Sequence, residues 1–124
     1  MSREIKFRAW VKSENCYMGK WSSTQNPTIF SAVNEVAEYY GDDDLVVEQY
    51  TGLKDKNGKE IYEGDILEFG IEGVRTIGFV GYSDDFASYE TYSKNGYIIR
   101  GLFGSIGKVI GNIHENKELL EGEE

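Results

Sequence analysis

The stretch QYTGLKDKNGKEIYEGDI, residues 49–66, decides the fold because it places a tight turn between two segments suited to β-strands. Its Asn57-Gly58 dipeptide tolerates positive φ at both central positions of a type I′ turn, and polar residues flank it on both sides. Residues 45–51 before the turn have the composition of a strand, and Glu63-Gly64-Asp65 turns the chain into a second series of strands. This block therefore predicts a hairpin that joins two β-rich parts of the chain.

Downstream of the hairpin, short apolar stretches alternate with glycine-rich or polar turns. They predict five strands, at about residues 65–69, 74–82, 87–92, 96–100 and 107–113. The 15 glycines and the 14% of aromatic residues suit a small antiparallel barrel. Gly78 and Gly81 lie within one of these runs and indicate a bulge or bend that helps a small sheet to close. We expect an SH3-like barrel at about residues 60–113.

Upstream of the hairpin, residues 4–11 alternate between apolar and polar side chains, as in a half-buried strand. A turn at Ser13-Glu14-Asn15 and a returning strand at residues 16–21 complete an opening hairpin. Apolar residues at helical spacing predict a helix over residues 32–40, with Ser31 as its cap and Gly41 as its stop.

The predicted fold class is therefore mainly β with minor α, in a single domain over residues 1–124. Its parts are an N-terminal β-hairpin and helix elaboration at residues 1–50, the barrel-like part at 51–113 and an acidic tail at 114–124.

Composition limits both the environment and the chemistry of the protein. The 124 residues suffice for about one domain, and 13 Lys and Arg against 22 Asp and Glu leave a formal charge of −9. No run approaches the roughly 18 apolar residues of a membrane helix, and the first residues carry charges where a signal peptide needs apolar ones, so we expect a cytoplasmic protein. Because Cys16 is the one cysteine, neither an internal disulfide nor a Cys-x-x-Cys zinc site can form.

The residue pattern shows no catalytic constellation. A nucleophile and base need Ser or Cys beside an oriented His, yet the one histidine, His114, suits a strand end, and Cys16 suits a buried position. Adjacent aspartates at residues 42–44 and 84–85 point to opposite faces of an extended chain, so a metal site there needs a distant third ligand. We therefore predict no enzyme, no cofactor and no metal site. The alternative, a metal-dependent enzyme, requires that several aspartates meet in one cleft, drawn from Asp44, Asp65, Asp84 and Asp85.

The hairpin block allows two interpretations. Either it only joins the two halves of the fold, or it presents a surface to an unknown protein partner or to a second copy of the chain. The candidate surface residues are Trp10, Tyr50, Lys54, Lys56, Lys59 and Tyr62. The net negative charge disfavours nucleic acid and membrane partners. A nucleic-acid-binding protein remains the alternative, and it requires basic residues to converge beside an aromatic one: Lys54, Lys56, Lys59, Arg75 and Arg100.

Three segments carry a family resemblance: KFRAW at residues 6–10, the block at 49–66 and VIGNIHEN at 109–116. Together they resemble the YopX protein family of phages and prophages of Gram-positive bacteria. The main departure is His114, where the family more often has a tyrosine. The resemblance implies a phage-derived protein of the host cytosol with an SH3-like barrel portion, and it implies no reaction and no catalytic residue. We therefore expect a non-enzymatic accessory protein that acts through protein contacts or self-association.

Overall fold

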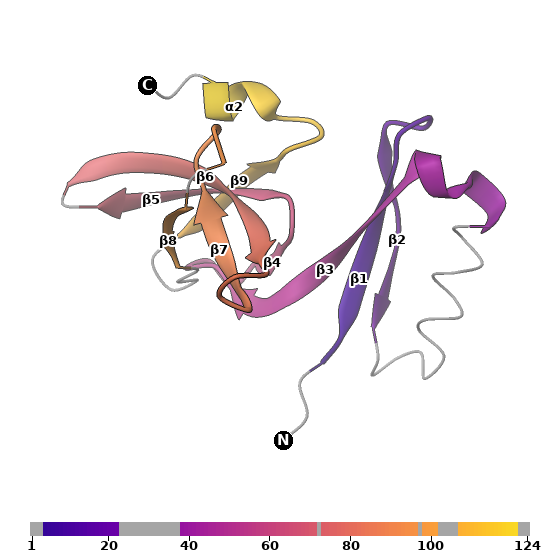
Figure 1. The fold of residues 1–124 in the computed structure, drawn as a ribbon, viewed down its shortest axis with the longest axis horizontal. Coiled ribbons are helices and arrows are strands. Elements are labelled where there is room, and N and C mark those ends of the chain that lie inside the picture. Colours follow the sequence, from indigo (N-terminus) through magenta and orange to yellow (C-terminus); the bar gives the residue numbers. More distant parts are fainter. Residues whose placement is uncertain (1–3, 23–37, 72, 97, 102–106, 122–124) are drawn as a thin grey trace. The chain divides into compact units, whose positions relative to one another are not determined.

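The computed structural model describes residues 4–22, 38–71, 73–96, 98–101 and 107–121, which are mainly β (Figure 1). The chain divides into two compact units, Met1–Gly52 and Leu53–Glu124, close to the predicted boundary after residue 50. One sheet has the strand order β2-β1-β3-β4 and the other β8-β7-β6-β5-β9. The strands are β1 (Lys6–Val11), β2 (Cys16–Ser22), β3 (Leu45–Lys54), β4 (Glu60–Tyr62), β5 (Asp65–Ile71), β6 (Val74–Ser83), β7 (Ser88–Tyr92), β8 (Ile98–Gly101) and β9 (Lys108–Asn112). The prediction of a mainly β fold is confirmed.

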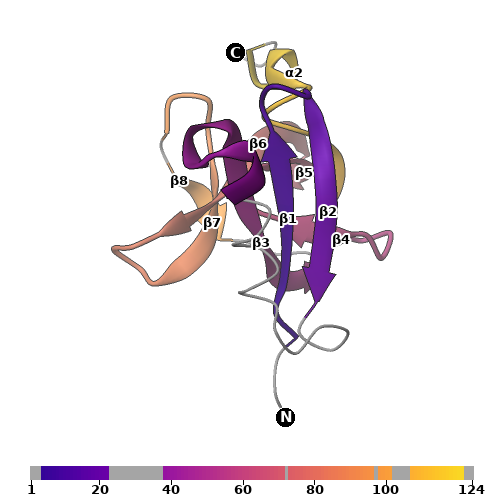
Figure 2. The same cartoon turned by 90° about the vertical axis from the view of Figure 1, so that its right-hand side faces the viewer.

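In unit 1, β1 is the central strand, antiparallel to both β2 and β3 (Figure 2). The turn into β2 ends at Asn15, which has φ 55 and donates its N–H to the carbonyl of Val11, so the predicted opening hairpin is confirmed. The prediction that β1 is half-buried is wrong, because Arg8 and Trp10 on its predicted polar face are buried. Burial of the charge is possible because Arg8 lies opposite Glu48 in the register and forms an ion pair with it.

Helical structure precedes β3. Residues 38–40 are helical, Gly41 follows with φ 88, and a short 3₁₀ helix, η1 (Asp42–Asp44), leads into β3. Gly41 therefore supplies the predicted stop, whereas residues 31–37, with the predicted Ser31 cap, lie outside the described residues. Within the described part of the chain, no helix is long and apolar enough to cross a membrane.

The turn between β3 and β4 lies where the sequence predicts it, but its type differs. Gly58 has φ 85 and Asn57 does not have positive φ, so the predicted type I′ turn is wrong. The N–H of Asp55 donates to the carbonyl of Lys59, and the N–H of Gly58 donates to the carbonyl of Asp55. These bonds enclose a three-residue loop with glycine in the left-handed region, as in a type I turn followed by a bulge. The Asp55 carboxylate favours this wider loop because it accepts the N–H groups of Asn57 and Lys59.

In unit 2, β5 to β8 form a meander, and β9 returns to pair with β5. Leu67 and Val80 belong to one core cluster, while Ile66 and Ile77 belong to another. Because neighbouring residues of β5 point to opposite faces, the sheet has an apolar cluster on each face. Leu120 of the helix α2 (Lys117–Glu121) completes the second cluster, so α2 packs against β6. This part of the predicted acidic tail is thus a helix with a buried leucine.

The barrel prediction is not confirmed. The last strand lies beside the first strand of the meander, an arrangement that a small closed sheet requires. Among the described residues, however, β8 and β9 are not paired with each other, so no closed barrel is found. The SH3-like barrel therefore stays a prediction.

Gly78 and Gly81 do not form the predicted bulge, whereas the alternative of a bend stays a prediction. The β5–β6 and β6–β7 pairings run through them without a register shift, so the predicted bulge is wrong. A Cβ atom at Gly78 would lie 2.6 Å from the carbonyl oxygen of Tyr92, and one at Gly81 would lie 3.0 Å from the Tyr92 ring. Glycine is needed because β7 approaches β6 closely at Tyr92.

Candidate functional site

The three aromatic residues of the predicted interaction surface are buried. Trp10 and Tyr50 in unit 1 are 3% and 7% exposed, and Tyr62 in unit 2 is 1% exposed. Trp10 packs edge-on against Tyr17 with 5.0 Å between ring centroids, and the Lys6 Nζ lies 5.7 Å from the centre of the Tyr50 ring. The hypothesis that these aromatic rings are presented to a partner is therefore wrong.

The three lysines of the same hypothesis are exposed on the β3–β4 hairpin, and a fourth joins them. The N–H of Lys56 donates to the carbonyl of Gly107 at 2.9 Å, which brings the exposed Lys108 next to the hairpin. We call Lys54, Lys56, Lys59 and Lys108 the lysine cluster. Sequence reasoning missed Lys108 because its proximity depends on a bond between segments that are distant in the chain.

Of the two arginines of the nucleic-acid alternative, Arg75 is paired with an acidic side chain. Both Nε and Nη2 of Arg75 contact Oε2 of Glu68, at 2.7 and 2.6 Å. Glu68 also lies opposite Lys108 in the β5–β9 register, so one carboxylate neighbours both cations. The side chain of Arg100 lies outside the described residues. The described side chains therefore show no convergence of lysines and arginines beside an exposed aromatic ring.

The aspartates of the metal-enzyme alternative have other partners or stand exposed. Asp44 in unit 1 accepts hydrogen bonds from the N–H and the hydroxyl of Ser13. Asp65 in unit 2 is buried and accepts the N–H of Tyr62 at 2.8 Å, and residues 84–85 are exposed in the β6–β7 turn. In the part of the chain that the structure describes, no group of three or more His, Cys, Asp or Glu side chains could hold a metal ion.

Asp55 is 6% exposed, and its carboxylate connects the β3–β4 hairpin to β9. Oδ1 accepts the N–H groups of Asn57 and Lys59 at 2.8 and 2.9 Å, and Oδ2 accepts the N–H of Val109 at 2.9 Å. Burial alone would raise the pKa of Asp55, but the three N–H donors and the Lys59 charge outweigh it and lower that pKa below its ordinary value. Asp55 is thus an ionised structural acceptor whose oxygens point at backbone groups.

Asn112 has a similar role where β9 ends. Its Oδ1 accepts the N–H groups of His114 and Glu115, each at 3.0 Å. The N–H of Ile113 donates to the carbonyl of Gly64 in the turn between β4 and β5. The turn after β9 and the segment before β5 therefore hold each other in place.

Exposed aromatic side chains gather at the β6–β7 hairpin. Tyr82 is 47% and Phe86 is 68% exposed, and the Tyr82 ring packs edge-on against Tyr89 at 5.2 Å between centroids. The N–H of Phe86 donates to Oγ of Ser83, and Ala87 adopts φ 50, a left-handed conformation that is uncommon for a residue with a side chain. The turn conformation is thus defined by specific local contacts. We call Tyr82, Asp84, Asp85 and Phe86 the aromatic tip.

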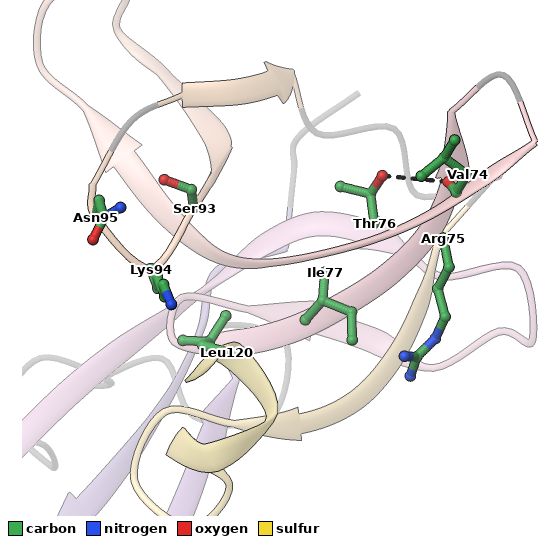
Figure 3. Close-up of a pocket in the computed structure, with 8 residues that line it drawn as sticks. All are labelled: Val74, Arg75, Thr76, Ile77, Ser93, Lys94, Asn95 and Leu120. Atoms are coloured by element: carbon green, nitrogen blue, oxygen red, sulfur yellow. Dashed lines mark hydrogen bonds between the residues drawn. The ribbon is translucent and has the colours of Figure 1, made fainter. Parts of the chain in front are cut away.

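A groove of about 370 Å³ lies between the start of β6, the β7–β8 turn and α2 (Figure 3). Ile77 and Leu120 form its floor, since each is only 7% exposed. In Figure 3, Ile77 lies between Lys94 on one side and Arg75 on the other. The groove is therefore apolar at its base and carries positive charge at its walls.

A family model described as YopX protein matches residues 6–121. The chain belongs to the YopX protein family. The resemblance seen in three sequence segments is thereby confirmed. A crystal structure of protein EF1440 from Enterococcus faecalis is similar, with a TM-score of 0.56 and 24% identity over 94% of this chain and 97% of that one, a likeness that shows the fold alone. No curated protein matches the chain.

In this YopX protein the segments that resemble the family have a structural explanation. The blocks at residues 49–66 and 109–116 contain Asp55, which bonds to Val109, and Gly64, which bonds to Ile113. Among the described residues of unit 2, the aromatic tip, the lysine cluster and the groove are open to a partner.

Proposed function

We propose that this YopX protein is a phage- or prophage-derived accessory protein of the host cytoplasm that acts by binding another protein and is not an enzyme. The observation that carries the proposal is the aromatic tip, because Phe86 is 68% exposed on a turn whose conformation local contacts define. Exposed aromatic side chains at a fixed position are typical of the centre of protein interfaces. The membership in the YopX family supports the phage origin.

Charge indicates the kind of partner. Asp84 and Asp85 are exposed beside Phe86, and the whole chain carries a formal charge of −9. A complementary surface has an apolar pocket for the Phe86 ring and a basic rim around it. Full burial of a phenylalanine side chain contributes about 1.5–3 kcal/mol, whereas exposed rim charges mainly accelerate association and exclude wrong partners.

The test is affinity purification of the tagged protein from cells in which the prophage is induced, with and without nuclease. We expect a stoichiometric protein that survives nuclease, is retained by Tyr39→Ser and is lost with Phe86→Ser. Tyr39 is the matched control because it is an aromatic residue with 82% exposure outside the tip. Equal capture by both variants would overturn the role of the tip.

The mass of the purified protein in solution separates binding to a different protein from self-association. If the wild-type chain is a dimer and Phe86→Ser is a monomer, the tip binds a second copy of the chain. If the wild-type chain is alone both in the purification and by mass, the protein-binding proposal is wrong.

A second candidate function is nucleic-acid binding by the lysine cluster, because its four lysines are exposed together. Because the described residues place no exposed aromatic ring beside them, contact with phosphates rather than base stacking is expected. Replacement of Lys56 and Lys59 by Gln should weaken binding of a DNA duplex and flatten its dependence on salt, whereas Lys12→Gln in unit 1 should not. Absence of measurable binding at about 50 mM salt would exclude this candidate.

A further inference from the structure

We propose that the groove of unit 2 binds a small organic anion, a molecule that joins one anionic group to a short apolar part. This site is separate from the aromatic tip, so its failure would leave the proposed function untouched. Its volume of about 370 Å³ is within the roughly 300–1,000 Å³ of small-molecule sites. The proposal rests on how apolar and cationic side chains are placed around this volume.

The floor of the groove provides the apolar part of the site. Ile77 and Leu120 lie in the core cluster that α2 and β6 build together, and only their outer edges reach the groove. Val74 stands at the start of β6 with 64% exposure and lines the same groove. A short alkyl chain or an aromatic ring placed on this floor would cover apolar surface that water now contacts.

The walls of the groove provide the charge. Lys94 and Arg75 line it, and they are the charged side chains among the described residues of its lining. Glu68 offsets the charge of Arg75 through the ion pair, which leaves Lys94 as the cation that can hold an anion. In a chain with a formal charge of −9, a groove whose described charged side chains are both cations favours an anionic ligand over a cationic one.

The β7–β8 turn gives Lys94 a defined place. The N–H of Gly96 donates to the carbonyl of Ser93 at 2.9 Å, and Gly96 has φ 85, so the turn closes around Lys94 and Asn95. The Asn95 amide lines the groove next to Lys94 and offers N–H donors to the same anionic group. The hydroxyl of Thr76 bonds to the carbonyl of Val74 on its own strand, at 3.3 Å.

Nuclear magnetic resonance of the full chain labelled with ¹⁵N tests the proposal with three probes: sodium octanoate, sodium acetate and octylammonium chloride. Octanoate should shift the amide signals of residues 74–77, 93–96 and 117–121. These shifts should reach a plateau as the octanoate concentration rises. Acetate lacks the apolar part and octylammonium has the opposite charge, so both should bind at least about threefold more weakly. Shifts spread over the whole surface, or equal binding of octylammonium, would overturn the proposal.

Two variants and one control locate the site. Lys94→Gln should weaken octanoate binding about three- to fivefold, as expected for loss of one exposed charge contact. Val74→Asp adds a negative charge at the rim of the groove and should weaken binding further. Lys56→Gln removes the same charge from the lysine cluster and should bind octanoate as the wild type does. If Lys94→Gln binds like the wild type, the assignment of the cation is wrong.

Discussion

The carboxylate of Asp55 accepts the backbone N–H of Val109 at 2.9 Å, across 54 positions of sequence. The same carboxylate accepts two N–H groups within its own hairpin, from Asn57 and Lys59. One buried side chain therefore determines both the shape of the β3–β4 turn and its attachment to β9. Stability, rather than catalysis, explains an aspartate at this position.

Asp55→Asn should destabilise the fold. The substitution replaces one acceptor oxygen by an NH₂ group, which leaves at least one part-buried backbone donor without its acceptor. We expect a loss of about 1–3 kcal/mol in the free energy of unfolding, measured with urea. Asp85→Asn in the exposed β6–β7 turn is the control and should change stability by no more than about 0.5 kcal/mol.

The pH dependence of stability should also depend on Asp55. Its folded-state pKa is lowered, so its contribution is complete above the ordinary value of an aspartate, about 4, and is lost as pH falls through the lower folded value. The difference in unfolding free energy between the wild type and Asp55→Asn should stay constant from pH 7 to 5 and shrink at lower pH. A difference that persists unchanged at the acid end would contradict this assignment.

Removing one residue of the buried ion pair of unit 1 should destabilise the fold strongly, whereas replacing both residues by apolar ones should change stability little. Arg8 Nε lies 2.8 Å from Glu48 Oε1, which also accepts the hydroxyl of Tyr17 at 2.9 Å. Glu48→Leu removes the carboxylate that pairs with the buried guanidinium and should lower the free energy of unfolding by about 3–5 kcal/mol. The double variant Arg8→Met/Glu48→Leu should recover most of that loss.

The exposed pair between Arg75 and Glu68 is the comparison for this experiment. Glu68→Gln should cost less than about 1 kcal/mol, because water screens a surface pair. Urea unfolding of the wild type, Arg8→Met, Glu48→Leu and the double variant completes the double-mutant cycle, and Glu68→Gln is its control. Similar costs at the two sites would show that burial does not govern the energy of the Arg8–Glu48 pair.

Gly78→Ala should destabilise unit 2, because the added Cβ would lie 2.6 Å from the Tyr92 carbonyl oxygen. This oxygen belongs to the backbone, so no change of side-chain rotamer can relieve the clash. We expect a loss of about 1–3 kcal/mol and a lower melting temperature. Gly70→Ala is the matched control on β5, since nothing lies within 4 Å of its added Cβ, and it should leave stability unchanged or raise it by about 0.5 kcal/mol. Equal melting temperatures of the two variants would contradict the close approach of β6 and β7.

Local sequence patterns predicted where the strands lie. The burial of their faces and the type of the turns depend on residues that are distant in the sequence. Alternation placed Phe7 and Ala9 on one face of β1, but burial of the opposite face requires the partner of Arg8, which is 40 positions away. The glycine at position 58 located the turn, yet its type follows from the Asp55 carboxylate, whose bonds a dipeptide rule does not include. The same limit explains the wrong bulge at Gly78, where the deciding neighbour is Tyr92 on the next strand.

The candidate site was less predictable than the fold. Tyr50 and Tyr62 suit a core and an interface equally well by composition, and only the packing of the sheets shows that both are buried. Phe86 follows two aspartates in a polar turn, and this position in the sequence is a signal for an exposed aromatic side chain. Lys94 and Leu120 are too far apart in the chain for any local pattern to place them in one groove.

The pairing of β9 with β5 has a consequence for protein synthesis. β5 is synthesised before the rest of the meander, but one of its edges stays unpaired until β9 has been made. The hydrogen bond between Asp55 and the N–H of Val109 forms only then. A nascent chain that stops before β9 leaves β5 unpaired on that edge, in the state that proteases and chaperones act on. Completion of unit 2 therefore depends on translation through β9, and we expect a chain truncated before β9 to be degraded faster than the full chain.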